Sequence, residues 1–222
     1  MREKDLVERE DSICHERGGS GLGHRALSGE EIRSFIAVEI NEPEILDNLR
    51  RLGTTLTDTG ANLRLVEVNN LHITLRFLGN VSYSLIDEVN GVLDKIAFQP
   101  FEVVLKGVGA FPSLRRVNVV WVGIEQGSTE LLHVVSQLEP KLRGLGFKPD
   151  RRGFVPHITV ARVKSGRNRD VLANTVANVS GMEFGGFGVD AIKLKKSVLT
   201  PKGPMYSTIH EVSAREGTQE RE

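Results

Sequence analysis

The chain has 222 residues, of which 39% are hydrophobic and 26% are charged, and its formal net charge at pH 7 is zero. This composition is typical of a globular protein with a sizeable core, and it excludes binding of polyanions through overall charge. The single cysteine, Cys14, excludes an intramolecular disulfide framework and a cysteine cluster for zinc. No run approaches the roughly 18 apolar residues of a membrane span, and the charged N-terminus is unlike a secretion signal. We therefore expect a cytoplasmic protein with no membrane partner.

The two ends of the chain differ from its middle. Residues 1–31 carry alternating charges and a glycine-rich stretch but no aromatic residue. Such a segment buries too little apolar area to offset its ordering entropy, which predicts a flexible extension or, equally, a wrongly assigned start. Residues 214–222 are expected to form a polar tail, which leaves residues 32–213 as the folded domain.

Strand and helix patterns alternate along this domain. In chain order, the patterns predict a strand at 34–40, a helix from Pro43 to about residue 52, a strand at 72–78, a helix at 85–96, strands at 101–108 and 117–124 joined by residues 110–116, a helix at 131–145, a strand at 157–163, a helix near 170–179, and strands near 183–189, 191–198 and 207–212. This interleaving favours an α+β fold with largely antiparallel sheets over a regular βαβ winding.

One short pattern occurs twice. Residues 71–75 read Leu-His-Ile-Thr-Leu, and residues 156–160 read Pro-His-Ile-Thr-Val. Each copy lies at the start of a predicted strand that a helix follows. The repeat therefore predicts two lobes of similar build that face each other, each of which supplies one His-x-Thr strand.

Alternation along a strand places His72 with Thr74, and His157 with Thr159, on one face, and the residues between them in the core. Two imidazoles suit a reaction in which one group takes a proton and another gives one, because histidine serves either role near neutral pH. Hydrolysis of a cyclic phosphodiester is such a reaction. The threonine hydroxyls can donate to phosphate oxygens, and neither a metal nor a cofactor is required.

A zinc site is the alternative use of two histidines. The two motifs supply threonine where a third histidine, cysteine or carboxylate ligand would be needed, so we expect no metal. The remaining histidines are expected to have ordinary surface or packing roles: His15, His24, His133 and His210.

Local charge favours an anionic substrate. Residues 141–169 include nine lysines and arginines but only one acidic residue, Asp150. Arg151 and Arg152 precede His157 in a glycine-containing loop that could fold over a phosphate, although such a charge run equally fits a solvated face. Phe154 in the same loop could stack a base or pack into the core.

At these residues the sequence resembles the two-histidine phosphoesterase superfamily, and more narrowly the RNA 2′,3′-cyclic phosphodiesterases, also called 2′-5′ RNA ligases. The resemblance runs from Arg33 to about Val212. It is carried by the segments 33–40, 71–79, 109–112, 120–123, 152–162 and 203–206.

The resemblance implies a bilobal fold of two antiparallel-sheet lobes, with helices on the outside and a central cleft. It implies that His72 is the proton donor, that His157 is the proton acceptor, and that the product is a 2′-phosphate made without metal or cofactor. It assigns the family's loop arginine to Arg152, where Gly153 follows in place of a common proline. Reversible 2′-5′ ligation of tRNA halves is described for relatives.

The implied partner is RNA with 2′,3′-cyclic phosphate ends, tRNA fragments among them, and the chain is expected to act as a monomer. Two other functions fit the residues. One is a non-catalytic module that binds RNA ends, which would not need both histidines. The other is a phosphodiesterase for a small cyclic nucleotide or a cyclic phosphate of ADP-ribose. Turnover of cyclic-phosphate oligonucleotides against mononucleotides would distinguish them.

Overall fold

The computed structural model describes residues 31–150, 153–201 and 203–215, and the expected N-terminal extension lies outside these residues except for its last position. The described strands are β1 (Glu31–Glu39), β2 (Leu63–Leu65), β3 (His72–Ser82), β4 (Phe101–Ser113), β5 (Arg116–Gln126), β6 (His157–Val163), β7 (Glu183–Val189), β8 (Ala191–Thr200) and β9 (Gly203–Ser213). The described helices are α2 (Pro43–Thr57), η1 (Val68–Asn70, a 3-10 helix), α3 (Tyr83–Leu93), α4 (Ser128–Gly144) and α5 (Arg169–Asn178). None of them is long and apolar enough to cross a membrane.

Every strand and helix expected from the sequence is present, although several boundaries differ: α2 and β3 end later than expected, at Thr57 and Ser82, α3 ends earlier, at Leu93, and β9 begins earlier, at Gly203. The short elements β2 and η1 were not predicted. Residues 110–113, expected to belong to a connection, continue β4, so that β4 and β5 form a long hairpin. Ala214 donates its backbone N–H to Asp190 O at 2.6 Å, and Arg215 donates to Phe98 O at 2.9 Å. The structured chain therefore extends at least two residues beyond the predicted boundary at Ser213.

The strands form one antiparallel sheet in the order β7-β4-β5-β6-β3-β1-β8-β9, and β2 pairs with β6. Between β3 and β6 the sheet is joined by one residue pair, Ile73 opposite Ile158. This narrow junction separates two halves of four main strands each. The expected α+β architecture of two antiparallel halves with helices on the outside is confirmed.

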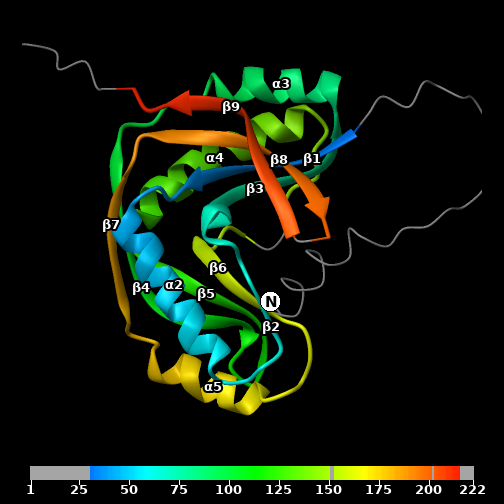
Figure 1. Ribbon diagram of the computed structural model, residues 1–222. Coiled ribbons are helices and arrows are strands. Elements are labelled where there is room, and N and C mark those ends of the chain that lie inside the picture. Colours follow the sequence, from blue (N-terminus) through cyan, green and yellow to red (C-terminus); the bar gives the residue numbers. More distant parts are fainter. Residues whose placement is uncertain (1–30, 151–152, 202, 216–222) are drawn as a thin grey trace, which may run out of the picture.

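Two helices pack against the half of the sheet that does not contain the strand preceding them in the chain. Helix α2 follows β1 in the chain but packs against β6, β7 and α5 of the other half (Figure 1). Helix α4 follows β5 and packs against it, and it also packs against β3 and α3 of the other half. Because each half is covered by a helix from the other, the two halves cannot separate without exposing a helix face. The residues at the junction are therefore held in place by both halves.

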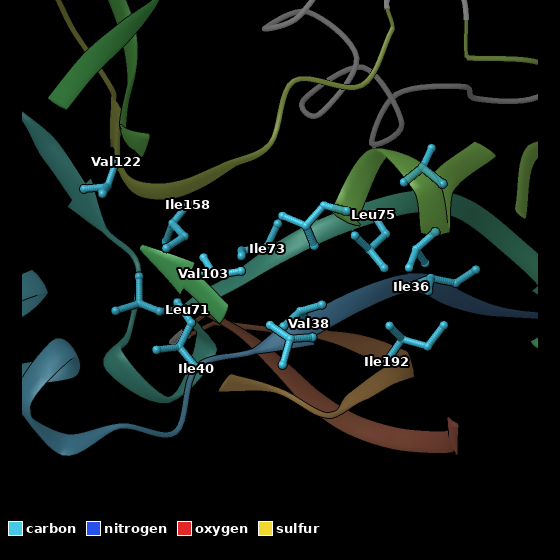
Figure 2. Packing of buried hydrophobic residues seen from close by; sticks show 14 of the residues in the cluster. Ile36, Val38, Ile40, Leu71, Ile73, Leu75, Val103, Val122, Ile158 and Ile192 are labelled. Atoms are coloured by element: carbon cyan, nitrogen blue, oxygen red, sulfur yellow. The ribbon is translucent and has the colours of Figure 1, made fainter. Parts of the chain in front are cut away.

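The hydrophobic core continues through this junction. Ile73 and Ile158 are fully buried, and Ile36, Val38 and Leu75 surround them on the helix side of the sheet (Figure 2). Burial of a side chain of this size stabilises the fold by about 1.5–3 kcal/mol. The burial of Ile73 and Ile158 thus fixes the rotation of β3 and β6 about their axes. It also fixes the direction of the histidine and the threonine that flank each isoleucine.

Candidate active site

The two His-x-Thr motifs meet at the centre of the sheet. Because Ile73 lies opposite Ile158 in an antiparallel pair, His72 lies toward Thr159 and Thr74 lies toward His157. All four side chains are half-buried, whereas the isoleucines are fully buried on the other face. The structure therefore brings the four predicted residues together on one face, which we call the site face.

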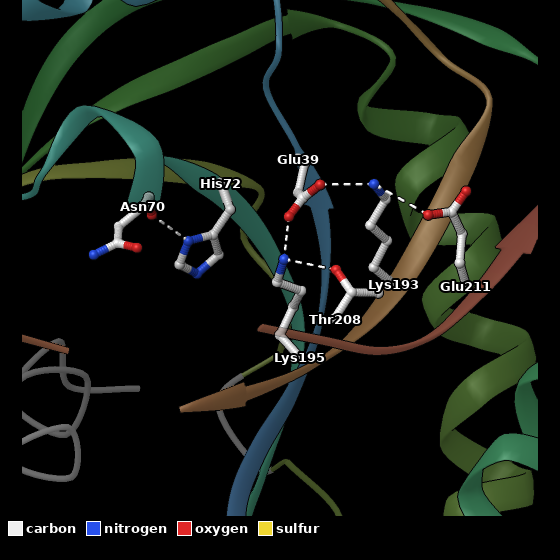
Figure 3. Close-up of polar contacts among 7 residues, drawn as sticks. All are labelled: Glu39, Asn70, His72, Lys193, Lys195, Thr208 and Glu211. Carbon is white, nitrogen blue, oxygen red and sulfur yellow. Dashed lines mark hydrogen bonds and ion pairs between the residues drawn. The ribbon is translucent and has the colours of Figure 1, made fainter. Parts of the chain in front are cut away.

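Both imidazoles are held in the same way. His72 Nδ1 lies 2.7 Å from Asn70 O, as Figure 3 shows, and His157 Nδ1 lies 2.7 Å from Val155 O. A carbonyl oxygen only accepts, so each Nδ1 must carry the proton and donate. This bond is kept in the neutral and the protonated ring alike. Nε2 is then the atom that takes or gives a proton in each histidine.

Each histidine also contacts two aromatic rings. The His72 ring centroid lies 4.9 Å from that of Phe35 on β1 and 5.5 Å from that of Tyr206 on β9. On the other half, His157 lies 5.1 Å from Phe111 on β4 and 6.4 Å from Trp121 on β5. The rings restrict the rotation of both imidazoles. In each half, one of the two rings comes from the strand next to the central strand, β1 or β5.

Gly109 makes room for one of these rings. A Cβ atom at this position would lie 2.2 Å from Cζ2 of Trp121, its partner across the β4–β5 pair. No side chain fits at that distance, so only glycine lets Trp121 lie flat over β4 beside His157.

A bulge in each central strand adds a further residue to the site face. In β3, Thr74 pairs with Ala37 but Arg76 pairs with Ile36, so Leu75 is the extra residue. The bulge reverses the alternation after it. Arg76 therefore points to the helix side, where it forms an ion pair with Glu139 at 2.6 Å, and Phe77, 42% exposed, lies on the site face.

The same bulge occurs in β6. Thr159 pairs with Trp121 and Ala161 pairs with Val120, which leaves Val160 as the extra residue. Ala161 is fully buried, and the next residue, Arg162, lies on the site face. Phe77 and Arg162, each five residues after its histidine, were not predicted as site residues, because a period of two assigns both to the opposite face.

A charged cluster lies beside His72. Glu39 is the register partner of His72 across the β1–β3 pair, and it accepts hydrogen bonds from both Lys193, at 2.7 Å, and Lys195 (Figure 3). Lys195 is buried and donates also to Thr208 at 2.9 Å. Lys193 bonds Glu211 as well, at 3.1 Å, so the cluster has two cations and two anions.

These bonds set the protonation of the cluster. Burial alone would raise the pKa of the Glu39 carboxyl, but the hydrogen bonds from Lys193 and Lys195 outweigh it and hold that pKa below its ordinary value. The bond to Glu39 raises the pKa of Lys193, against the lowering effect of burial. At neutral pH Glu39 and Lys193 are therefore both charged. On the other half, the register partner of His157 is Gly123, which has no side chain.

The other predicted site residues lie apart from this centre or outside the described chain. Arg151 and Arg152 fall outside the described residues. Phe154 is half-buried and packs against the core, which favours the packing alternative, and base stacking by it stays a prediction. His133 is exposed, and His210 lies 2.7 Å from Asp94. Among the described residues, no group of three or more His, Cys, Asp or Glu could hold a metal ion.

The aromatic contacts had a signal in the sequence. Phe111, Trp121 and Tyr206 lie within the short segments that carry the family resemblance, but the segments alone assign them no role. Glu39 also lies within such a segment, 33–40, but its place opposite His72 depends on the register between β1 and β3.

Comparison with known proteins agrees with the resemblance in the sequence. The model of the 2′-5′ RNA ligase superfamily matches residues 43–195. An RNA 2′,3′-cyclic phosphodiesterase of Aeropyrum pernix is 40% identical over 170 residues, which cover 77% of this chain and 97% of the relative. Another of that name, from Methanothermobacter thermautotrophicus, is 37% identical and covers 80% of this chain and 96% of its own length.

Solved structures have the same fold. TT0787 of Thermus thermophilus matches with a TM-score of 0.71 and 26% identity, and the match covers 84% of this chain and all of the other. LigT of Escherichia coli, crystallised with 3′-AMP, matches with a TM-score of 0.69 and 24% identity over the same share of both chains, which shows the fold alone.

Proposed function

Because this chain belongs to the 2′-5′ RNA ligase superfamily, we propose that it hydrolyses 2′,3′-cyclic phosphate ends of RNA with His72 and His157 as an acid–base pair. The observation that carries the proposal is the matched bonding of the two imidazoles. Each donates Nδ1–H to a backbone carbonyl two residues upstream and keeps Nε2 for proton transfer. The relatives that are named as RNA 2′,3′-cyclic phosphodiesterases support the choice of reaction.

The reaction needs one proton taken and one given. His157 Nε2 takes a proton from water as the water oxygen forms a bond to phosphorus. The bond from phosphorus to the 3′-oxygen breaks, and His72 Nε2–H protonates that oxygen. The products are a 2′-phosphate and a 3′-hydroxyl, and a proton exchange with water restores both rings. The assignment of donor and acceptor follows the resemblance of the two motifs to the family.

The remaining site residues bind the phosphate and the base. Thr74 and Thr159 donate hydroxyl hydrogens to the non-bridging oxygens. Arg162 supplies a guanidinium on the same face, and a guanidinium bonds phosphate through two parallel N–H groups. Phe77 offers an exposed ring on which a base can stack. Arg152, with Arg151 as its rival, and Phe154 remain candidate substrate contacts from the loop before His157.

The proposal extends to the joining of two RNA ends. If the 5′-hydroxyl of a second RNA takes the place of water, the same two proton transfers join the ends through a 2′-5′ bond. The name of the superfamily supports this activity. We further propose that the substrates include tRNA fragments and that the chain acts as a monomer in the cytoplasm.

Product analysis on an RNA that ends in a 2′,3′-cyclic phosphate tests the function. We expect an RNA with a 2′-phosphate, formed equally well in excess EDTA, because proton transfer and hydrogen bonding come from side chains. A 3′-phosphate product would contradict the assigned leaving group. Activity that is lost in EDTA and restored by zinc or magnesium would contradict the metal-free mechanism. Tight binding without turnover would favour the RNA-end binding module.

A further inference from the structure

Asn70 makes two contacts that lead away from its own segment. Its backbone carbonyl accepts the hydrogen bond from His72 Nδ1 at 2.7 Å, as Figure 3 shows. Its side-chain amide donates to Pro204 O at 2.8 Å, across 134 residues of the chain. A carbonyl oxygen only accepts, so the amide must present its N–H group to Pro204. Asn70 thus connects His72 with the hairpin of β8 and β9.

The segment that carries the Asn70 carbonyl has little support of its own. Asn70 is the last residue of η1, and none of the three residues of this helix is buried. Its turn is closed by two backbone bonds, from Asn70 N–H to Glu67 O at 2.8 Å and from Leu71 N–H to Val68 O at 3.2 Å. A 3-10 turn of this length has poor hydrogen-bond geometry. We therefore expect the contact with Pro204 to fix the direction of the Asn70 carbonyl.

The other end of this contact is firmly held. The Thr200 hydroxyl donates to Gly203 O at 2.6 Å and accepts from Gly203 N–H at 3.2 Å. These bonds join the end of β8 to the start of β9, and Leu199 pairs with Pro204 in the next position of the ladder. Pro204 O is therefore a rigid anchor for the Asn70 amide.

The same hairpin supplies a ring that packs against His72. Tyr206 lies two residues after Pro204 on β9, so the two side chains share a face. The Tyr206 ring centroid lies 5.5 Å from that of His72, with the ring planes at 87°. The partner of Nδ1 and the ring beside the imidazole thus both depend on how the hairpin lies against η1, which the Asn70 amide sets.

The His157 side of the site is built differently. The carbonyl that accepts from His157 Nδ1 belongs to Val155, at 2.7 Å. A valine side chain has no polar group, and this one is 51% exposed, so it cannot tie its segment to a neighbouring strand in the same way. The tether is therefore a property of the half that carries the proposed proton donor.

We infer that Asn70 is a positioning residue that holds the His72 imidazole in the tautomer and direction needed to protonate the leaving oxygen. This inference rests on the proposed function. As the bond from phosphorus to the 3′-oxygen breaks, Nε2 gives its proton to that oxygen, and the neutral ring keeps Nδ1–H on the Asn70 carbonyl. A displaced carbonyl lets the ring turn or keep its proton on Nε2. Because its amide is bonded to Pro204, Asn70 acts through His72 and not on the substrate.

Steady-state kinetics on an RNA that ends in a 2′,3′-cyclic phosphate test the inference with three variants. We expect Asn70→Ala to lower kcat roughly tenfold and to leave KM nearly unchanged, because a misplaced acid slows the chemical step alone. Asn70→Asp keeps the size of the side chain but has no N–H to donate at neutral pH, so it should lose at least as much. The matched control is Asn69→Ala, which changes the exposed neighbour in the same helix.

Heteronuclear NMR of the histidine rings reads the tautomer without any substrate. The spectra are recorded at alkaline pH, where an imidazole is neutral, and the signals of His72 are assigned by their loss in His72→Ala. We expect the wild type to carry the proton on Nδ1 at both His72 and His157. Both Asn70 variants should mix the two tautomers at His72 and leave His157 unchanged, whereas Asn69→Ala should change neither.

A wild-type kcat in Asn70→Ala would overturn the inference. A raised KM with unchanged kcat would overturn it too, because the amide would then bind the substrate. A His72 proton that stays on Nδ1 in both variants, or a loss of the fold in both by circular dichroism, would assign Asn70 a merely structural role. If the cyclic phosphate is not opened even by the wild type, the proposed function fails, and the NMR spectra still decide whether Asn70 sets the tautomer of His72.

Discussion

At the scale of single residues, the place of Arg162 depends on one extra residue in β6. Val160 has no partner on β5, and this bulge turns Arg162 from the helix side to the site face. The equivalent bulge at Leu75 in β3 turns Phe77 to the site face. The two motifs are thus alike from the histidine to the threonine. They differ at the residue that the bulge adds to the site face, which is the aromatic Phe77 in one half and the cationic Arg162 in the other.

Arg162→Ala should therefore lower kcat/KM by about ten- to a hundredfold, because a charge-assisted contact with phosphate is worth roughly 1.5–3 kcal/mol. Arg162→Lys should recover only part of the loss, since an ammonium lacks the two parallel donors. Arg143→Ala, which removes an exposed arginine of α4, is the matched control. Steady-state kinetics on a cyclic-phosphate RNA measure all three, and an Arg162→Ala variant with wild-type constants would remove this residue from the phosphate site.

At the scale of elements, neighbouring strands fix the rings beside each histidine. Trp121 on β5 contacts His157 because Gly109 on β4 leaves space for the indole. Phe111, two residues further along β4, contacts both His157 and Trp121. The orientation of His157 thus depends on the β4–β5 hairpin, and a change on β4 reaches the imidazole through a ring on β5.

Gly109→Ala should displace Trp121, lower stability by about 1–3 kcal/mol and lower kcat by about ten- to a hundredfold through the misplaced imidazole. The control is Gly188→Ala on β7, where an added Cβ meets nothing within 4 Å. Chemical denaturation and kinetics on the two variants separate the effects. Equal behaviour of both variants would mean that the indole has space to spare and does not position His157.

The cluster on β1, β8 and β9 makes stability depend on pH. The folded state holds the pKa of Glu39 below its ordinary value, so its contribution is fully present above the unfolded pKa and is lost as pH falls through the folded one. The raised pKa of Lys193 has the opposite sign, and its contribution is lost only as pH rises through that value. Both contributions are therefore complete at neutral pH.

We expect the free energy of unfolding of the wild type to fall below about pH 4.3, the ordinary range of a glutamate, and Glu39→Gln to flatten this part of the curve. The variant should also be less stable at neutral pH, because Lys195 stays buried without its carboxylate. Glu183→Gln, which removes a surface partner of Lys106, is the control. A Glu39→Gln curve parallel to the wild type would contradict the role of the cluster in acid stability.

Much of this organisation could be predicted from the sequence. Periodicity located the main strands and helices, and the alternation of Ile73 with His72 and Thr74 gave the buried and open faces of β3. Register could not be predicted, because it depends on bulges at Leu75 and Val160 that no local pattern marks. Phe77 and Arg162 were missed for that reason, and Glu39 was missed because its place opposite His72 is set by pairing between strands. Strand β2 was missed because three residues are too few for a periodic signal.

At the scale of the whole molecule, the site exists only where the two halves meet. Each half contributes one histidine, one backbone carbonyl that orients it and two rings beside it. One residue pair, Ile73 with Ile158, joins the central strands, and the exchanged helices α2 and α4 hold the halves in place. The geometry thus implies that neither histidine works without the other half.

The central claim is that His72 and His157 act as one acid–base unit across this junction. Kinetics of His72→Ala, His157→Ala and the double variant on a cyclic-phosphate RNA test it most directly, with circular dichroism to verify the fold. We predict that each single change lowers kcat by about a hundredfold or more, the scale of a lost general acid or base. The double variant should be scarcely slower than the slower single variant, because paired groups act together. Losses that multiply in the double variant, or a single variant with wild-type kcat, would contradict the account.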